Sequence, residues 1–571
     1  MRDRPIAATG VLAAFCDAGM LSLVDFHLAR RVGDLAGEAD PLVQLAFALA
    51  VRELRLGSVC VDLATAAQEL RPEVDGEAGD IDPATLPWPE PAAWVALVAR
   101  SPAVAGPGDP TGAFRLDGTL LYLDRYWRQE RRLADLLRAR SAADPGAPVA
   151  APALPDALDE HQRAAIFAAL SHTTTVITGG PGTGKTTIVG QLLAALAPAA
   201  PRVALCAPTG KAAARLLTAV GGAGGSTWGG TLHRLLGLRP RSAETEYGPE
   251  NPLPFDVVVV DETSMVSLEL MALLLGALSP ATRLILLGDP HQLRSVEAGA
   301  VLADIESAHD LVRAPGGAIA RLVHNYRSGE QINHLADAIL AGDAEAARRA
   351  IDEGPAVELL PFDGATDPTA LATVRDDARE IAEGVRERAA RGDGAAANAW
   401  LGRHRILCGH REGPFGVAHW ARSVRGWLAG QLPGYGFEGR AYVGQPLLIQ
   451  RNSDLFSNGD TAVVVAQEDG ETLLAAVDRP EGLLTVSPAL LDDAADLHAM
   501  TIHKSQGSQF DRVSVVLPPV SSPLLTRELL YTAVTRAHDA VRLYGSWEAL
   551  AAAIATPARR ASGLAAGAEP R

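Results

Sequence analysis

Apolar residues recur every three to four positions through much of residues 1–140, which predicts amphipathic helices. Two short apolar runs inside this region, at 57–63 and 120–123, instead predict strands. The next segment, 141–155, is rich in Pro and Ala and follows neither periodicity. We therefore predict a helical N-terminal domain at 1–140 that docks a partner, followed by a linker at 141–155.

Continuous apolar runs separated by helical segments replace this pattern in residues 156–340. The run 257–260 consists only of valines, which is typical of a strand buried on both faces of a parallel sheet. Runs at 202–207 and 283–287 have the same character. The polar segment 239–254 contains a Gly-Pro turn and predicts an inserted loop or hairpin. The sequence thus predicts an α/β domain whose ligands bind after the carboxyl ends of its strands.

A Gly-rich loop follows the first predicted strand of this domain and leads into a helical pattern. Its spacing, G-x-x-x-x-G-K-T, is typical of loops whose backbone N–H groups bind phosphate, although a Gly-rich turn can match by chance. The following helix N-terminus adds a partial positive charge. Lys185 would contact the β- and γ-phosphates, and Thr186 would hold Mg²⁺. The predicted nucleotide-binding residues here are Gly179, Gly180, Pro181, Gly182, Thr183, Gly184, Lys185, Thr186 and Thr187.

Polar side chains at other points of this domain extend the predicted site. Asp261 and Glu262 follow the valine run, where Asp261 would hold Mg²⁺ and Glu262 would activate the attacking water. The alternative for this acidic pair is a helix N-cap. Gln292 follows a further strand, and its amide could sense the γ-phosphate. Gln162 precedes the Gly-rich loop and has an amide that can pair with an adenine edge.

The second half of the chain, 341–555, begins with an Ala-, Glu- and Arg-rich helical segment and continues with a strand at 405–408. At about 440–495, apolar runs alternate with Asn-Gly and Asp-Gly turns, which predicts an inserted small β-barrel. The last segment, 556–571, has low complexity and predicts a disordered tail.

Composition narrows the class of protein. The 571 residues are 48% hydrophobic, enough for ordinary buried cores. Apolar runs are too short to span a membrane and no signal-peptide pattern is recognised, so we expect a soluble, cytoplasmic protein. Four widely separated cysteines indicate neither a disulfide framework nor a Cys-x-x-Cys metal site. The net charge of −17 argues only weakly against nucleic acid, because a local basic channel can exist on an acidic protein.

Lysine is nearly absent from the chain. Among the 51 Lys and Arg residues, only positions 185, 211 and 504 are lysine. A drift toward arginine should spare lysine where a compact ammonium is needed, although three lysines could also survive by chance. Lys211 opens a predicted helix after a Pro-Thr-Gly turn, and a helix N-terminus with a cation suits a nucleic-acid phosphate.

Eight motifs in a fixed order resemble those of superfamily-one DNA helicases of the 5′→3′ type. They are GGPGTGKT, APTGKAAARL, TLHRLLG, VVVVDETSM, LLGDPHQLRSVEAGAVL, LVHNYRS, AMTIHKSQGSQFD and YTAVTRAHDAV. The series covers about residues 160–545 and is most similar to the RecD family, the alpha subunits of exodeoxyribonuclease V. The N-terminal part resembles this family only in length and helical character. The resemblance implies two RecA-like motor domains, at 156–340 and 341–555, and an SH3-like identity for the barrel insertion.

The same resemblance implies roles for individual residues. Arg327 and Arg536 match the family's two arginines that approach the γ-phosphate across a cleft and stabilise developing charge. Gln162 matches the adenine contact, and Gln292 the residue that couples the γ-phosphate to movement. Gln509 stands where Glu is usual, which puts its polar contact in doubt. The predicted DNA contacts are Thr209, Lys211, His233, Arg234, Thr501, His503, Lys504, Ser505 and Gln506.

The motif series implies an ATP-dependent 5′→3′ DNA helicase, the motor of a helicase-nuclease that processes double-strand DNA ends for recombinational repair. Its implied partners are single-stranded DNA, duplex DNA ends, a RecB-like helicase-nuclease and a RecC-like scaffold in a heterotrimer. We expect no nuclease site, because all three lysines lie in helicase motifs. The segment 239–254 is either a strand-separating wedge or an ordinary surface loop.

Two other functions stay open on the sequence. A standalone RecD-like helicase would carry a longer N-terminal region with DNA-binding hairpins. An NTP-driven switch or scaffold would not need Lys211, the TIHKSQGS stretch and Arg536 together.

Overall fold

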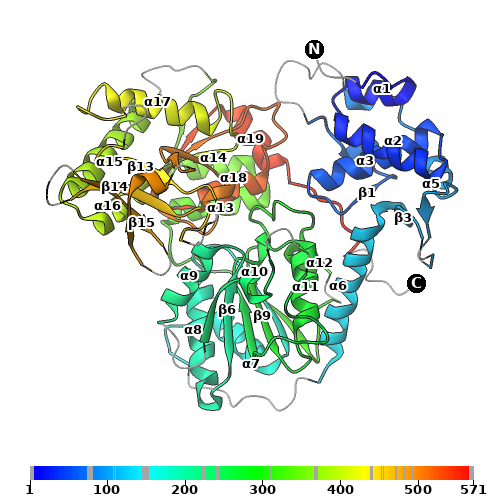
Figure 1. The fold of residues 1–571 in the computed structure, drawn as a ribbon, viewed down its shortest axis with the longest axis horizontal. Helices are drawn as coiled ribbons and strands as arrows, with labels where there is room; N and C mark the ends of the chain where they lie inside the picture. Colours follow the sequence, from blue (N-terminus) through cyan, green and yellow to red (C-terminus); the bar gives the residue numbers. More distant parts are fainter. Residues whose placement is uncertain are drawn as a thin grey trace.

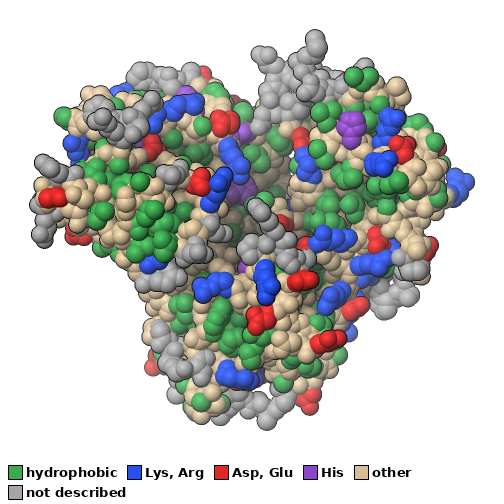
Figure 2. Space-filling view, viewed as in Figure 1, with side chains coloured by type: hydrophobic (Ala, Val, Ile, Leu, Met, Phe, Trp, Pro, Cys, Tyr) green, Lys and Arg blue, Asp and Glu red, His purple; other side chains and the backbone are tan. Residues whose placement is uncertain are grey.

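Three bodies make up the fold, and the face shown in Figure 2 is hollowed where they meet (Figures 1 and 2). They are an N-terminal body, a central body with a six-stranded sheet and a C-terminal body with two five-stranded sheets. The computed structural model describes residues 5–73, 82–106, 108–109, 111–144, 154–221, 227–239, 244–308, 311–364, 371–436, 441–451, 453, 455–467, 469, 472–479, 482–491 and 493–564.

The N-terminal body combines helices with a small sheet of order β1-β4-β3-β2. Ser22 and Asp25 form a capping box at the start of α2, and Asp40 caps α3 with Pro41 in its first turn. Both predicted strands are present, and β2 and β3, which were not predicted, join them in the sheet. The main elements are α1 (Gly10–Asp17), α2 (Leu23–Ala36), α3 (Pro41–Arg55), β1 (Cys60–Asp62), α4 (Ala66–Glu69), α5 (Pro91–Val98), β2 (Val104–Ala105), β3 (Phe114–Asp117) and β4 (Leu120–Leu123).

Helix α6 (Asp124–Ala142) connects the N-terminal body to the central body and packs against α11 (Leu268–Ala277). Near its end Arg140 is buried and donates to the Thr174 hydroxyl at 2.9 Å. The helix therefore continues past the domain boundary predicted at 140. Most of the predicted linker, 145–153, lies outside the described residues.

The central body is built on a parallel sheet of order β10-β5-β9-β8-β6-β7, which confirms the predicted α/β fold. All four valines of β8 are buried, as predicted for a central strand. Because β5, β9 and β8 are neighbours and parallel, the segments that follow them leave the sheet at one edge. The elements are α7 (Glu160–Ser171), β5 (Thr174–Gly179), α8 (Lys185–Leu196), β6 (Val203–Ala207), α9 (Gly210–Ala219), β7 (Thr227–Thr231), α10 (Leu232–Leu235), β8 (Val257–Val260), β9 (Arg283–Gly288), α12 (Val301–Ser307) and β10 (Gly317–Leu322).

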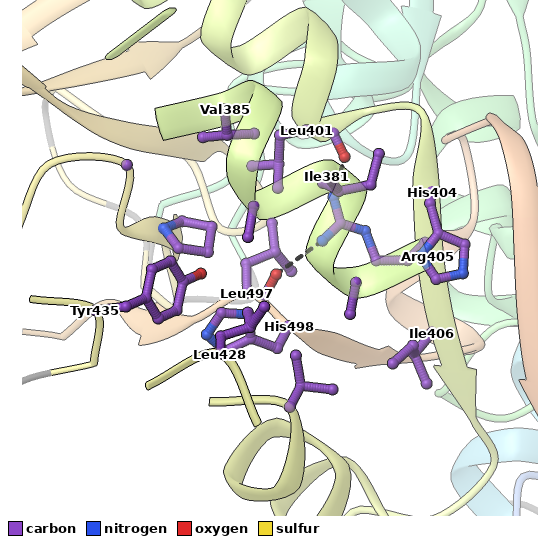
Figure 3. Close-up of a pocket in the computed structure, with 15 residues that line it drawn as sticks. Ile381, Val385, Leu401, His404, Arg405, Ile406, Leu428, Tyr435, Leu497 and His498 are labelled. Carbon is purple, nitrogen blue, oxygen red and sulfur yellow. Dashed lines mark hydrogen bonds between the residues drawn. The ribbon is translucent and has the colours of Figure 1, made fainter. Parts of the chain in front are cut away.

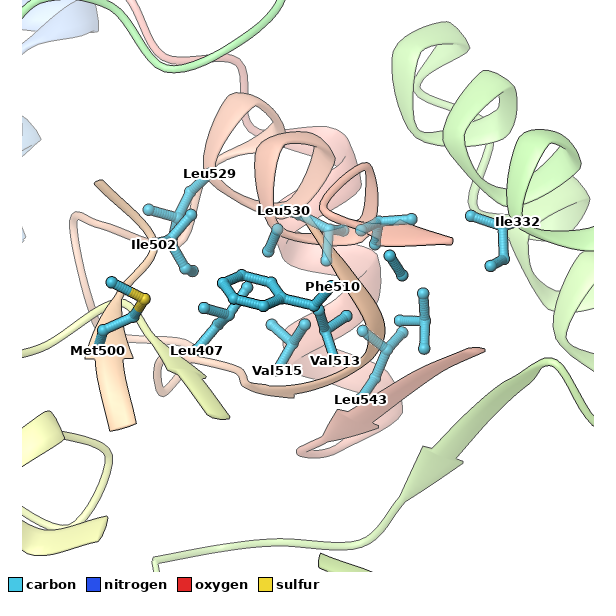
Figure 4. Packing of buried hydrophobic residues seen from close by; sticks show 14 of the residues in the cluster. Ile332, Leu407, Met500, Ile502, Phe510, Val513, Val515, Leu529, Leu530 and Leu543 are labelled. Atoms are coloured by element: carbon cyan, nitrogen blue, oxygen red, sulfur yellow. The ribbon is translucent and has the colours of Figure 1, made fainter. Parts of the chain in front are cut away.

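The C-terminal body contains a second parallel sheet, of order β11-β20-β19-β12-β18. Phe510, Val513 and Val515 of β19 are buried against Leu529 and Leu530 of α18 (Figure 4). The elements are α13 (Glu330–Ala341), α14 (Ala344–Asp352), β11 (Val357–Leu360), α15 (Ala372–Ala390), α16 (Gly394–Leu401), β12 (His404–Cys408), α17 (Val417–Ala429), β18 (Ala499–Thr501), β19 (Phe510–Val516), α18 (Arg527–Val534), β20 (Ala537–Tyr544) and α19 (Trp547–Ala555).

An antiparallel sheet occupies the position of the predicted insertion. Its order is β16-β15-β14-β13-β17, with β16 and β17 at opposite edges. The insertion is therefore confirmed as a β-sheet, whereas its closure into an SH3-like barrel stays a prediction. The strands are β13 (Pro446–Leu448), β14 (Thr461–Ala466), β15 (Leu473–Asp478), β16 (Leu484–Val486) and β17 (Ala495–Asp496).

A small cavity lies in the C-terminal body between α15, α17 and β12 (Figure 3). Most of its lining is apolar, but Arg405 is buried there and donates to the carbonyl oxygens of Leu497 at 2.8 Å and Leu401 at 3.1 Å. Burial lowers the pKa of Arg405 to about 10. Since Leu497 lies two residues before β18, this arginine helps to fix the backbone that leads to the motif-bearing segment 501–506.

The end of the chain packs against the N-terminal body. The backbone N–H of Val59 donates to the Ala561 carbonyl at 2.8 Å, Ser562 Oγ donates to Glu130 Oε2 at 3.0 Å, and Leu564 is buried. The prediction of a disordered tail is therefore wrong for 556–564, because this segment forms hydrogen bonds with residues that are distant in the sequence. Residues 565–571 lie outside the described part of the chain. No described helix is long and apolar enough to cross a membrane.

Glu130 makes the stability of this junction depend on pH. It is buried and accepts a hydrogen bond from the Tyr122 hydroxyl at 3.1 Å, and burial raises its pKa to about 7. Because the pKa of Glu130 is higher in the folded state than its unfolded value near 4.5, binding of a proton to Glu130 stabilises the fold. This contribution to the free energy of unfolding is complete below pH 4.5 and is lost as the pH rises to 7. We expect Glu130→Gln to gain up to about 3 kcal/mol over wild type between pH 5 and 8, measured by thermal unfolding. The exposed control Glu345→Gln should show no gain, and an equal pH profile for Glu130→Gln and wild type would contradict this account.

Candidate active site between two parallel sheets

A cleft lies between the central and C-terminal bodies. The central sheet contributes the segments after β5 and β8, and the C-terminal body contributes the segments beside β19 and α18. Eleven residues predicted from the sequence to act at the nucleotide are thus brought together at one site. These residues are Pro181, Gly182, Gly184, Lys185, Thr186, Thr187, Asp261, Glu262, Gln292, Arg327 and Arg536.

The Gly-rich loop has a backbone that other residues adopt poorly. Gly182 and Gly184 have φ values of 83° and 85°, in the left-handed region. Gly184 directly precedes α8, so the helix N-terminus faces the cleft. Lys185 Nζ donates to the carbonyl oxygens of Gly179 at 2.5 Å and Gly180 at 2.8 Å, which keeps the ammonium over the loop. Loss of hydration in the cleft lowers the pKa of Lys185.

The two acids follow β8 as predicted. Glu262 has a φ of 51°, and its backbone N–H donates to Asp261 Oδ1 at 2.8 Å. A left-handed non-glycine residue is strained, and such residues concentrate at functional sites. No side-chain capping hydrogen bond from Glu262 is present at the described turn Thr263–Met265, so the N-cap alternative is not supported. Burial is the larger cause and the negative charge of the neighbouring Glu262 the smaller cause that together raise the pKa of Asp261 to about 6.

Gln162 supports the Gly-rich loop from α7. Its Nε2 donates to the Thr183 carbonyl at 3.1 Å, and its Oε1 accepts from the Asp159 backbone N–H at 3.2 Å within a capping box. Gln162 is buried beside Gly184, where a Cβ would lie 2.4 Å from Nε2. The structure thus places Gln162 at the loop, while its contact with adenine stays a prediction.

Both predicted arginines reach the cleft, from different elements. Arg327 follows β10, and the backbone N–H of the preceding Tyr326 donates to the Gly182 carbonyl at 3.0 Å, which holds this segment on the loop. Arg536 follows α18 and is 2% exposed, with its Nε donating to the Thr532 carbonyl at 3.0 Å. Burial lowers the pKa of both guanidinium groups.

The sequence analysis missed Arg215 as a residue of the cleft. Arg215, on α9 of the central body, donates to Gln509 Oε1 of the C-terminal body at 3.0 Å. Gln509 thus makes a polar contact, because its amide oxygen accepts this hydrogen bond. A usable signal existed: Lys211 and Arg215 are four residues apart on one helix and so share a face.

Several predicted DNA contacts lie at the protein surface. Lys211, His233, Arg234 and Lys504 are exposed, and His503 is partly exposed. Thr209 Oγ1 accepts from the Ala212 backbone N–H at 3.3 Å and thus caps α9. Lys211 also lines a hollow between α9 and the insertion strands β14 and β15.

Three other predicted DNA contacts are buried among protein atoms in this structure, and their contact with DNA stays a prediction. Ser505 is 0% exposed and donates to the Ile502 carbonyl at 2.7 Å. Thr501 Oγ1 accepts from the Lys504 backbone N–H at 3.3 Å, and Gln506 Nε2 donates to the Leu293 carbonyl of the central body at 2.7 Å. These side chains hold the segment in place because the short turn around Ile502 points them into the interior.

Two parallel sheets that place a phosphate loop opposite buried arginines form the nucleotide site of a two-lobed P-loop ATPase motor. Three family models match the chain: RecBCD enzyme subunit RecD, N-terminal domain, at 17–122; AAA domain at 162–298; and UvrD-like helicase C-terminal domain at 496–544. The chain is 46% identical to the RecBCD enzyme subunit RecD of Mycobacterium tuberculosis H37Rv over 587 residues, covering 98% of this chain and 97% of the relative. The chain belongs to the RecD family.

The chain is also similar to other proteins. The RecBCD enzyme subunit RecD of Mycolicibacterium smegmatis is 46% identical, covering 97% of this chain and 98% of that protein. The ATP-dependent RecD2 DNA helicase of Deinococcus radiodurans is 32% identical, covering 79% of this chain and 58% of that protein. The crystal structure of Bacteroides Pif1 bound to ssDNA has a TM-score of 0.40 and 17% identity, covering 68% of this chain and 92% of that chain.

Arg215 provides a test of the cleft. Replacing it with Gln removes one cation that faces the predicted phosphates and weakens the contact with Gln509. We expect the KM for ATP to rise about tenfold, in line with the value of a charged hydrogen bond. Steady-state ATP hydrolysis measures the change, and Arg30→Gln on the half-exposed face of α2 is the matched control. An unchanged KM for ATP in Arg215→Gln would show that Arg215 does not contribute to nucleotide binding.

Proposed function

We propose that this chain is the ATP-dependent DNA helicase and translocase subunit of a RecBCD-type enzyme that processes double-strand DNA ends. One observation carries the proposal: Arg536 of the second sheet is buried in the cleft whose phosphate loop belongs to the first sheet. A nucleotide in this cleft therefore contacts both lobes, so its binding and hydrolysis change how the lobes sit together. If the affinity of each lobe for the DNA strand differs between the states before and after hydrolysis, each cycle of hydrolysis moves the protein along the strand in one direction.

The chemistry assigns a role to each predicted residue. Lys185 and the loop N–H groups bind the β- and γ-phosphates, Glu262 takes a proton from the attacking water, and the two arginines stabilise charge on the transferred phosphoryl group. Asp261 and Thr186 line the same cleft and offer hard oxygen ligands, which fits Mg²⁺. When bound, Mg²⁺ supplies charge neutralisation between the phosphates. Gln162 contacts the adenine edge.

The exposed polar side chains extend the site toward DNA. Lys211, His233 and Arg234 lie on the central body and Lys504 on the C-terminal body, so that each lobe offers contacts to a strand that crosses both. The 5′→3′ direction follows from the family resemblance. The motor domains are 156–340 and 341–555, with the insertion at about 440–495 as an SH3-like barrel and segment 239–254 as the strand-separating wedge.

The assembly is a heterotrimer with a RecB-like helicase-nuclease and a RecC-like scaffold. The match of 17–122 to the N-terminal domain of RecD supports the subunit over a standalone RecD2-type helicase. Residues 1–140 dock these partners, and nuclease activity belongs to the RecB-like subunit.

The proposed function is tested by measuring ATP hydrolysis with and without single-stranded DNA. We expect DNA to stimulate hydrolysis strongly in the wild type. Lys185→Ala should lose it, and Glu262→Gln should lower kcat by about 10² to 10⁴ while nucleotide binding is kept. Hydrolysis indifferent to DNA, in the chain alone and with its partners, would favour an NTP-driven switch instead.

A further inference from the structure

Three hydrogen bonds connect the C-terminal body to the segment that follows β9. The Tyr531 hydroxyl donates to Asp289 Oδ2 at 3.0 Å. The Leu293 backbone N–H donates to Thr532 Oγ1 at 2.8 Å, and the Leu293 carbonyl accepts from Gln506 Nε2 at 2.7 Å. Segment 289–293, which carries Gln292, is therefore held from the opposite lobe.

Asp289 is the point where this interaction reaches the predicted catalytic residues. It is 1% exposed, and its Oδ2 accepts both from Tyr531 and from Gln292 Nε2, at 3.0 Å each. Its other oxygen accepts from the His291 backbone N–H at 3.0 Å. One buried carboxylate thus joins a hydroxyl of the C-terminal body to the Gln292 amide of the central body.

This carboxylate fixes which end of the Gln292 amide faces the cleft. Two acceptor oxygens repel each other, so the amide nitrogen must face Asp289 and the amide oxygen must point away. Gln292 lines the cleft, and its Oε1 is buried with no hydrogen-bond partner among the described residues. A free acceptor at this place suits the attacking water, which must be held by an acceptor to be oriented.

The Tyr531 hydroxyl also lies against the phosphate loop. A Cβ at Gly180 would lie 2.9 Å from the hydroxyl oxygen, so only glycine leaves room for it. Burial raises the pKa of Tyr531, so the hydroxyl remains a donor. Since Tyr531 belongs to α18 of the C-terminal body, separation of the lobes breaks its bond to Asp289.

We propose that Tyr531 is a positioning residue for ATP hydrolysis, whose hydroxyl holds Asp289, and through it the Gln292 amide, only while the lobes are closed. This inference rests on the proposed motor function and adds how lobe closure reaches the attacking water. Tyr531 itself does not contact the reacting atoms. Its effect passes entirely through Gln292.

Tyr531→Phe tests the proposal because it removes one oxygen and keeps the ring. In DNA-stimulated ATP hydrolysis we expect kcat to fall about tenfold with KM for ATP changed less than about twofold, since a hydrogen bond to a carboxylate is lost but binding is kept. In a Gln292→Ala background the same substitution should lower kcat no further. The control is Tyr544→Phe, the same change on β20, where the ring packs against Trp420 away from the cleft.

The double variant separates positioning from a general structural effect. An equal fall in both backgrounds, or an unchanged kcat in Tyr531→Phe, would overturn the proposal. Thermal unfolding of each variant detects loss of folding, and Asp289→Asn, which should reproduce the fall, tests the relay independently. The assay is repeated in the complex with its partners. A complex that carries Lys185→Ala gives the ATP hydrolysis that does not come from this chain, and this rate is subtracted. Failure of DNA stimulation in the wild type counts against the motor function, whereas failure of the double variant counts only against Tyr531.

Discussion

The arrangement of the cleft depends on the balance of charge within it. Lys185, Arg215, Arg327 and Arg536 come from four different elements and face one space, with carboxylates such as Asp261 among them. Like charges held out of water repel one another and are costly unless a counter-charge joins them. The phosphates of a nucleotide supply that counter-charge, so the contact between the lobes strengthens when the ligand binds. The parallel sheets, the strained backbone of Glu262 and the glycines of the loop all place charged groups around this one ligand.

The sequence predicted the parts of the site that are local in the chain. The phosphate loop follows β5 and the two acids follow β8 directly in the chain. Each strand and its functional residues therefore lie in one continuous segment of the sequence, where they can be predicted together. Arg215 could have been suspected from its spacing to Lys211, but its contact with Gln509, and that of Tyr531 with Asp289, could not be predicted, because each partner lies in another body. The tail at 556–564 was mispredicted for the same reason: its composition is that of a disordered segment, but its partners are Val59 and Glu130.

Motif residues in this chain do not all face a ligand. Ser505 and Gln506 belong to a stretch predicted to touch DNA, but one supports its own turn and the other crosses to the central body. Lys504, which directly precedes these two residues in the sequence, is exposed. A motif therefore combines a residue that reaches outward with residues that fix its position, and spacing alone does not distinguish them.

The packing of the chain's end against its beginning affects the order in which the molecule is made. Synthesis proceeds from the N-terminus, and early parts begin to fold as they emerge from the ribosome. Val59 and Glu130, however, receive partners only when Ala561 and Ser562 have left the exit tunnel. The body that is synthesised first is thus completed last. A chain that stops early lacks this closure, and its exposed junction distinguishes it from a finished subunit.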